Sequence, residues 1–217
     1  MKKRVLLMGL AAVMVMGAVV GGSLAAGQTS AENPVTAPLA AATLNIEWTG
    51  GESDPVALTV TDKALMPADE IEVKDGYQVD NTGSVDAYIR VTVTKYWADR
   101  DGKTTELDAA NIQLGLNSAD WIKAEKLFEG NSDETEVYYY KYPVPAGQST
   151  SELLETIGIP ASLTNEYAGM TVHLEAVADG VQFAGADAAD LNASGILASW
   201  GVSAQLDENG NLVSVTE

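Results

Sequence analysis

Residues 84–103 read SVDAYIRVTVTKYWADRDGK, and from Val85 to Val93 every second side chain is apolar. The apolar positions are Val85, Ala87, Ile89, Val91 and Val93, and the positions between them are Asp86, Tyr88, Arg90, Thr92 and Thr94. A period of two places alternate side chains on opposite faces of an extended strand. Turn-forming residues stand on both sides, in VDNTGS before the stretch and in DRDG after it. The stretch therefore predicts a strand from about Val85 to Trp97 with one face on a hydrophobic core.

Shorter stretches with strand patterns recur along the chain. They are TLNIEW, VALTVT, EIEVKDGYQVDN, NIQLGL, DWIKAEKLF, TEVYYYKYPV and MTVHLEAVAD, with a closing hairpin around Asn209-Gly210 in VSAQLDENGNLVSV. Helical signals occur in two segments: STSELLETIGIP, with a capping box from Ser149 to Glu152, and a segment from about Asp187 to Trp200. Many short strands and few helices favour an all-β fold. We expect a jelly-roll or Greek-key β-sandwich over residues 43–217, with one or two short helical insertions.

The N-terminus has the features of an export signal. Lys2, Lys3 and Arg4 precede an uncharged apolar run, and small residues at Ser23 and Ala25 fit the pattern that a signal peptidase reads. Residues 1–25 are therefore interpreted as a signal peptide, with an uncleaved membrane anchor as the alternative. Residues 26–42, AGQTSAENPVTAPLAAA, have no apolar period and are expected to form a flexible N-terminal segment.

Composition excludes several classes of partner and site. Removing residues 1–25 takes away three basic residues and no acidic ones, which changes the formal net charge from −19 to −22. Such a chain lacks the basic surface that binding to nucleic acid requires. For the same reason, binding to an anionic membrane surface is unfavourable. Because there is no cysteine, the chain has no disulfide, thiolate metal site or cysteine nucleophile. Stability must come from packing.

The motifs of common enzymes are absent. The single histidine, His173, excludes an HExxH zinc site, and neither a GxSxG elbow nor a Walker loop is present. His173 is expected to point away from the strand face formed by Val172, Leu174 and Ala176. Two acidic loops, DRDGKT and DENGN, resemble parts of calcium loops but lack the distal glutamate, so we interpret both as hairpin turns. The sequence predicts no cofactor, no metal and no catalytic residue.

A run of tyrosines suggests a contact surface. Tyr138, Tyr140 and Tyr142 share one face of the strand predicted in TEVYYYKYPV. Rings on both faces of a strand suit packing on one side and a partner on the other, although packing alone is the alternative. Tyr138 and Tyr140 are therefore predicted interface residues.

The order of several short motifs resembles the TasA/camelysin-like family of exported proteins from Gram-positive bacteria. The motifs are VVGGSLAAG, TLNIEW, NTGSVDAYIRV, YYYKYPVPAGQSTSELLETIGIP, LEAVADGVQ and ASWGV, and together they extend over nearly the whole chain. The resemblance implies a secreted jelly-roll protein whose signal peptide is handled by a dedicated type of signal peptidase. TasA-like members form extracellular fibres of the biofilm matrix, in which an N-terminal segment of one subunit completes the sheet of the next.

By this resemblance, residues 26–42 occupy the place of a donor strand. Val35, Leu39 and Ala41 are the side chains expected to enter a groove on a neighbouring subunit. Pro34 and Pro38 remove two ladder donors, so the added strand should be irregular or begin after Pro38.

The leading hypothesis is an exported, non-enzymatic structural protein that self-associates as a fibre subunit in the extracellular matrix or at the cell surface. After cleavage, the signal peptidase would no longer be a partner, and no stable membrane insertion is expected. One alternative is a monomeric secreted module that binds a polysaccharide or a host protein through its tyrosine face. The other is a camelysin-like metallopeptidase, which would depend on His173.

Overall fold

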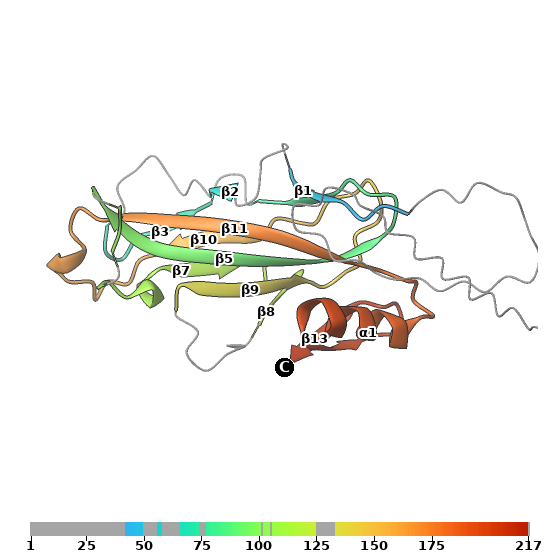
Figure 1. The fold of residues 1–217 in the computed structure, drawn as a ribbon. Coiled ribbons are helices and arrows are strands. Elements are labelled where there is room, and N and C mark those ends of the chain that lie inside the picture. The colour runs from blue at the N-terminus through green and yellow to red at the C-terminus, as the bar shows by residue number, and fades with distance from the viewer. Residues whose placement is uncertain are drawn as a thin grey trace, which may run out of the picture.

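A large antiparallel sheet forms the middle layer of the structure (Figure 1). The computed structural model describes residues 42–49, 56–57, 66–73, 77–100, 102–104, 106–124 and 133–216. In the large sheet the strands follow the order β2 (Val56–Ala57), β11 (Thr171–Gln182), β5 (Ala87–Asp99), β9 (Thr135–Tyr140) and β8 (Trp121–Lys123), and β6 (Gly102–Lys103) pairs with β5. The fold is mostly β-sheet with one α-helix among the described residues, as the all-β expectation requires.

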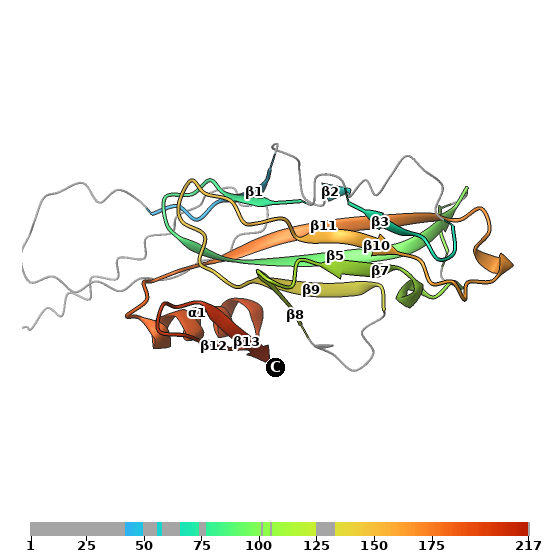
Figure 2. The same ribbon diagram turned by 180° about the vertical axis from the view of Figure 1, so that it is seen from behind.

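Two smaller antiparallel sheets cover one face of this layer. One has the strand order β3 (Glu70–Glu72), β10 (Leu154–Gly158) and β7 (Gln113–Leu116), and the other pairs β1 (Ile46–Trp48) with β4 (Val79–Asn81). Figure 2 shows β3, β10 and β7 running alongside β5 and β11. Apolar side chains from all these sheets meet in the main core, which includes Trp48, Val79, Ile89, Val91, Val93, Trp121, Leu154, Ile157, Leu174 and Ala176. Two short 3₁₀ turns, Ala109–Asn111 and Asn165–Tyr167, lie in the connections.

The alternating stretch that dominates the sequence forms the longest strand. β5 begins at Ala87, two residues later than expected, and it pairs with β11 over twelve consecutive positions, from Gln182 opposite Ala87 to Thr171 opposite Ala98. Ile89, Val91 and Val93 are fully buried on the core side, which confirms the predicted face.

The opposite face of the large sheet is covered at one end by the C-terminal unit, residues 189–216. It consists of α1 (Ala189–Trp200) and the hairpin of β12 (Ser203–Leu206) and β13 (Leu212–Thr216), which confirms the second predicted helix and the hairpin around Asn209-Gly210. A second core joins this unit to the sheet and contains Tyr88, Tyr139, Val181, Ile196, Trp200, Val202 and Leu212.

Polar contacts help to hold the C-terminal unit in place. The Tyr88 hydroxyl donates to the Gly210 carbonyl over 2.7 Å. Arg90 forms an ion pair of 3.0 Å with Asp179, the Trp200 indole N–H donates to the same carboxylate, and the Arg90 guanidinium lies 5.4 Å from the centre of the Trp200 ring. These contacts join one end of α1 and the tip of the hairpin to the sheet.

The segment after Ser149 is a strand, and the expectation of a helix there is wrong. Leu154–Gly158 forms β10 and pairs with β3 on one side and β7 on the other. The Thr150 hydroxyl accepts from the Val79 backbone N–H over 3.0 Å, so the start of the segment is tied to β4 instead of capping a helix. Neighbouring strands supply both sides of the ladder, and this tertiary pairing overrides the local helical signal.

The first described residues of the chain, from Ala42 to Asn45, lie beside the turn between β4 and β5. Ser84 donates its backbone N–H to the Thr43 carbonyl over 2.8 Å, and the Gly83 N–H donates to the Asn45 carbonyl over 3.0 Å. The predicted signal peptide and nearly all of residues 26–42 lie outside the described residues. Among the described residues, no helix has the length and apolar character needed to cross a bilayer.

Replacing Gly83 by alanine should disturb the contact of Thr43 and Asn45 with the β4–β5 turn. A Cβ at Gly83 would lie 2.4 Å from the Thr43 carbonyl oxygen and 2.8 Å from the Asn45 nitrogen, both backbone atoms. We expect Gly83→Ala to lower the free energy of unfolding by about 1–3 kcal/mol, the usual cost of overpacking, as measured by urea denaturation. Gly195→Ala in α1 is the matched control, because its Cβ would make an ordinary 3.5 Å contact with the Val181 side chain on β11. That control should be neutral or stabilising by up to about 1 kcal/mol, and equal losses in both variants would contradict the prediction.

Candidate functional site

A lysine stands on the core face of the longest strand. Lys95 follows Val91 and Val93 in the inward-facing register of β5, and the residue is only 3% exposed. A buried ammonium group is costly unless charged and polar partners surround it. Its surroundings are therefore the first place to look for chemistry.

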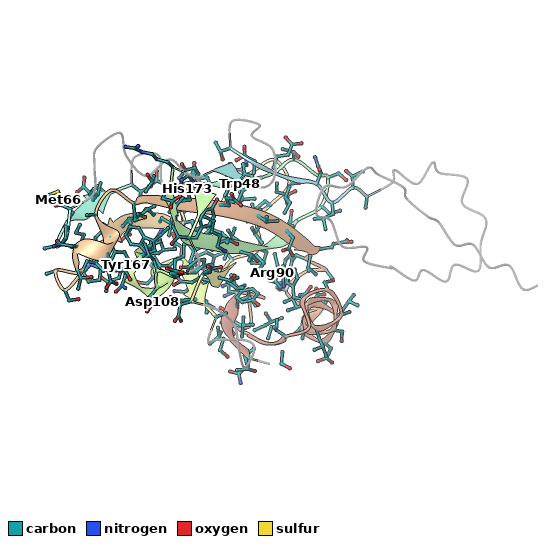
Figure 3. All side chains as sticks on the ribbon, turned by 60° about the vertical axis from the view of Figure 1, so that its left-hand side comes forward. Trp48, Met66, Arg90, Asp108, Tyr167 and His173 are labelled. Atoms are coloured by element: carbon teal, nitrogen blue, oxygen red, sulfur yellow. The ribbon has the colours of Figure 1, made fainter. Side chains whose placement is uncertain are left out.

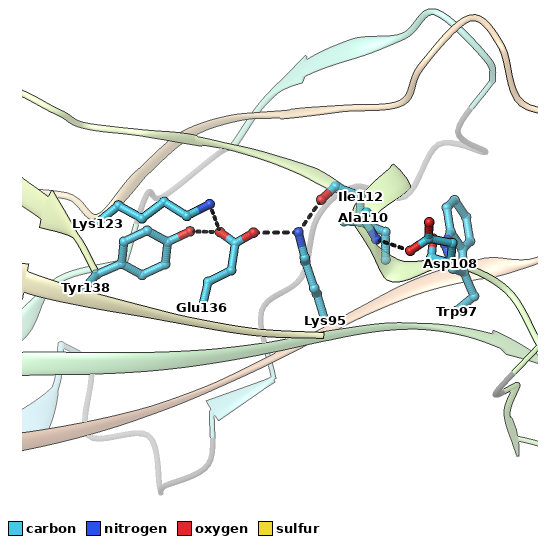
Figure 4. Close-up of polar contacts among 8 residues, drawn as sticks. All are labelled: Lys95, Trp97, Asp108, Ala110, Ile112, Lys123, Glu136 and Tyr138. Atoms are coloured by element: carbon cyan, nitrogen blue, oxygen red, sulfur yellow. Dashed lines mark hydrogen bonds and ion pairs between the residues drawn. The ribbon is translucent and has the colours of Figure 1, made fainter. Parts of the chain in front are cut away.

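The partners of the Lys95 side chain come from two other parts of the fold (Figure 4). The Lys95 Nζ atom lies 2.6 Å from Oε1 of Glu136 on β9, and it donates to the Ile112 carbonyl over 2.7 Å. The second oxygen of Glu136 accepts from the Tyr138 hydroxyl and forms an ion pair of 2.8 Å with Lys123 on β8. The Lys123 side chain is 52% exposed, so this four-residue group, the buried ionic cluster, reaches the surface at the β8 edge of the sheet.

The cluster keeps its carboxyl group ionised. Burial by itself would raise the pKa of Glu136, but hydrogen bonds from Lys123, Lys95 and Tyr138, together with the positive charge of Lys95, outweigh burial and lower that pKa. Burial raises the pKa of Tyr138 far above its usual value, and the negative charge of Glu136 adds to the rise. Tyr138 therefore remains a neutral hydrogen-bond donor and Glu136 an acceptor.

This geometry suits stabilisation better than catalysis. Three donors occupy the Glu136 carboxylate, and a carboxylate with a lowered pKa is a weak base at neutral pH. The contacts instead connect β5, β8 and β9 with the backbone next to the 3₁₀ turn that ends at Asn111. The cluster fixes the relative positions of these segments within the core.

His173 lies on the outer face of the large sheet, as predicted. The residue is exposed, and its ring stacks on Tyr96 of the neighbouring strand with centroids 5.3 Å apart. The Tyr96 hydroxyl donates to Glu175 over 3.0 Å, and the Lys103 ammonium lies 5.3 Å from the Tyr96 ring centre. In the described part of the chain, no three His, Asp or Glu side chains form a group that could hold a metal ion. His173 thus belongs to an exposed aromatic and charged surface.

The acidic loop DENGN has the hydrogen bonds of a turn. Oδ1 of Asp207 accepts from the backbone N–H groups of Asn209 and Asn211, both over 2.8 Å, and Oδ2 accepts from the Asn211 side chain over 2.9 Å. Gly210 has a φ of +79°, which suits glycine in a hairpin turn. In the other loop, Asp99 ends β5 and Asp101 lies outside the described residues.

The predicted interface residues do not form one surface in the structure. Tyr138 is fully buried in the main core, because β5 and β8 flank its strand and its hydroxyl donates to Glu136. Its prediction as an interface residue is therefore wrong. Tyr140 is half-buried against Trp121 and accepts from the Ser151 N–H, whereas Tyr142 is 41% exposed. Val35, Leu39 and Ala41 lie outside the described residues.

The sequence contains a signal for the buried ionic cluster, although no functional motif marks it. Lys95 interrupts a series of apolar residues at alternate positions, and Glu136 does the same ahead of Tyr138 and Tyr140. A charged residue in the core register of a strand predicts a buried partner, although spacing alone cannot identify that partner.

Compared with known proteins, the chain matches no family model, no curated protein and no solved structure.

Breaking the buried pair should cost more than removing it. We expect Glu136→Leu to lower the free energy of unfolding by about 3–5 kcal/mol, because it leaves the buried Lys95 without its carboxylate partner. Lys95→Met should cost less, because Glu136 keeps its contacts with Lys123 and Tyr138. The double variant should recover a substantial part of the loss, since an apolar pair can replace a buried ion pair. Chemical denaturation of the four proteins measures the coupling, and additive losses in the double variant would contradict the proposed pairing.

The same pair gives a pH dependence of defined sign. Because the folded-state pKa of Glu136 lies below the ordinary value of 4.5, its stabilising contribution is complete above that value and is lost as the pH falls through the folded pKa. The stability difference between the wild type and Glu136→Gln should therefore be constant near neutral pH and shrink below about pH 4.5. Denaturation curves across this range test it, and a difference that grows on acidification would show the opposite linkage.

Proposed function

We propose that this chain is an exported, non-enzymatic structural protein whose subunits associate by strand addition into fibres of the extracellular matrix or cell surface. The observation that carries the proposal is the attachment of the chain at Thr43. Backbone hydrogen bonds fix Thr43 and Asn45 beside the β4–β5 turn, so residues 26–42 would lead directly into a rigid part of the fold. A segment joined in this way can connect its own subunit firmly to a neighbour.

The open sheet edges support strand addition. Within the described residues, β2 and β8 are the edge strands of the large sheet, and β3 and β7 are the edge strands of the three-stranded sheet. An edge strand presents unpaired backbone groups that another chain can use. Val35, Leu39 and Ala41 are the proposed donor side chains, with the ladder starting after Pro38.

The fold proposed for the subunit is a jelly-roll or Greek-key β-sandwich. Its support is the main core, in which side chains of the large sheet meet those of β10, β4 and β1. Export from a Gram-positive bacterium, with signal peptidase as a transient partner, rests on the N-terminal sequence and on the family resemblance. The sequence and the fold support a secreted acidic β protein. The further proposal that it is a subunit of matrix fibres depends on the order of the motifs.

A monomeric secreted binding module is the second candidate. The exposed stack of Tyr96 and His173 favours it, because aromatic and charged groups lie together on a sheet face outside the second core. This function requires no self-association, which separates it from the first proposal.

The test compares residues 26–217 with a chain that begins at Thr43. We expect the longer protein to build filaments in negative-stain microscopy and to elute as large species, and the shorter protein to stay free of filaments. Leu39→Asp in the longer chain should also abolish filaments. Ala40→Asp is the matched control, because it adds the same charge within the proposed ladder at a position of opposite parity to Leu39 and Ala41.

Monomers of both chains at every pH and calcium concentration would contradict the fibre proposal and favour the binding module. Filaments from both chains would show instead that assembly does not use the N-terminal segment.

A further inference from the structure

The tip of the β12–β13 hairpin contains the one asparagine of the chain that is followed by glycine. Asn209 is exposed and precedes Gly210, whereas every other asparagine precedes a residue with a side chain. A backbone nitrogen that follows asparagine can attack the carbon of the side-chain amide, and a side chain on the attacking residue hinders the approach. Glycine has no Cβ, so it hinders the attack least. In this chain the covalent structure therefore favours self-modification at Asn209–Gly210.

The reaction needs no partner except water. The Gly210 nitrogen forms a bond to Cγ of Asn209 and loses its proton as the side-chain amide leaves as ammonia, which gives a cyclic imide. Water then breaks one of the two bonds between that nitrogen and the carbonyl carbons of the ring. Breaking the new bond gives aspartate. Breaking the original peptide bond gives isoaspartate, in which the backbone runs through the former side chain.

The folded hairpin restrains the attacking nitrogen. The Gly210 N–H donates to the Asp207 carbonyl over 3.0 Å, and the carbonyl of the buried Gly210 accepts from the Tyr88 hydroxyl over 2.7 Å. The Gly210 backbone is also closely packed, since a Cβ there would lie 2.6 Å from a carbon of the Phe183 ring. Ring closure requires the Gly210 nitrogen to turn towards the Asn209 side chain, and these contacts oppose that rotation. Attack therefore requires the tip of the hairpin to open.

Contacts outside the hairpin keep its tip closed. Among the described residues, β12 and β13 pair only with each other, and a two-stranded hairpin is marginally stable by itself. Leu212, the first residue of β13, packs in the second core, and its N–H donates to the Lys141 carbonyl over 2.7 Å. The Tyr88–Gly210 hydrogen bond joins the tip itself to the large sheet, so losing this bond should increase local opening.

Isoaspartate does not fit the closed tip. It adds one methylene to the backbone before Gly210, which displaces the Gly210 carbonyl from the Tyr88 hydroxyl. Tyr88 is fully buried, and a buried donor without an acceptor is unfavourable. The reaction also places a new carboxylate next to Asp207 and Glu208, where like charges repel.

We propose that Asn209–Gly210 is a self-modification site that acts as an irreversible switch in the C-terminal unit. While the tip is closed, the attacking nitrogen is held and modification is slow. Once the tip opens, isoaspartate forms, and the lengthened backbone prevents the tip from closing on Tyr88 again. The C-terminal unit then loses one of its attachments to the large sheet. The inference is independent of the proposed fibre function.

The rate of modification tests how the tip protects this site. Residues 26–217 are incubated at mildly alkaline pH, both folded and in urea, and peptide mapping measures ammonia loss and isoaspartate at Asn209. The mapping uses a protease that cuts after glutamate or aromatic residues, because no lysine or arginine follows Lys141. We expect modification to be slower by about ten-fold or more in the folded protein than in urea, because only the open tip reacts.

Two tyrosine variants test whether the protection arises at the tip. Tyr88→Phe removes the hydroxyl that donates to the Gly210 carbonyl, and it should speed modification of the folded protein several-fold. Tyr96→Phe is the matched control, because it removes a hydroxyl that donates to Glu175, towards the other end of β5. Its rate should equal that of the wild type. Circular dichroism confirms that each variant is folded, and the comparison of the wild type with and without urea does not depend on either variant.

Hydrogen exchange tests the effect of the product. Aged protein is separated by ion exchange, since modification adds a negative charge, and the fractions that contain isoaspartate are compared with unmodified protein. Backbone amides of α1, β12 and β13 should exchange several-fold faster in the isoaspartate fractions. Freshly prepared Asn209→Asp is the matched control, because it adds the same charge without lengthening the backbone. It should exchange like the wild type.

Three results would overturn the inference. Equal rates of modification in the folded protein and in urea, or equal rates in Tyr88→Phe and Tyr96→Phe, would show that the closed tip does not protect Asn209. Isoaspartate fractions that exchange like Asn209→Asp would show that the product does not loosen the C-terminal unit. The fibre proposal is tested separately by the presence of filaments, so either proposal can fail without the other.

Discussion

The antiparallel pairing of β5 with β11 is the interaction on which the rest of the structure depends. Twelve consecutive residue pairs join the two strands, and the main core packs against one side of them. At one end, Tyr88 on β5 and Val181 on β11 also face the second core, so the pair is buried on both sides there. The smaller sheets and the C-terminal unit therefore depend on the same two strands, although they do not belong to one core.

The buried ionic cluster adds positional information that apolar packing alone does not provide. Apolar side chains at alternate positions fix which face of a strand is buried, but a shift of two residues along a neighbour preserves that pattern. In the observed register Val93 lies opposite Glu136, so Lys95 reaches Glu136 diagonally across β5 and β9, and Lys123 reaches the same carboxylate from β8. The three strands are therefore tied together at one carboxylate, and buried polar groups help to set the register in some other folds.

Much of the fold followed from local patterns, and the failures have a common physical cause. The alternation in β5 and β11, the Asn209-Gly210 turn and the helix ending at Trp200 are specified by neighbours in sequence, and the structure contains all of them. The segment around Leu154 also fits a helix, but its partners β3 and β7 are distant in sequence and local signals do not report them. Tyr138 and Lys95 show the same limit, because burial depends on which strands become neighbours. The candidate site was thus less predictable than the elements that carry it.

The scarcity of basic residues has a consequence for proteolysis. Proteases that cut after lysine or arginine need such a residue in an accessible, unpaired backbone segment. Within the described ranges six residues qualify by type, and four of them, Arg90, Lys95, Lys103 and Lys123, lie in strands. From Tyr142 to Glu217 there is none at all. The last 76 residues, which include β10, β11 and the C-terminal unit, therefore contain no cleavage site for enzymes of trypsin-like specificity, whether the chain is folded or not.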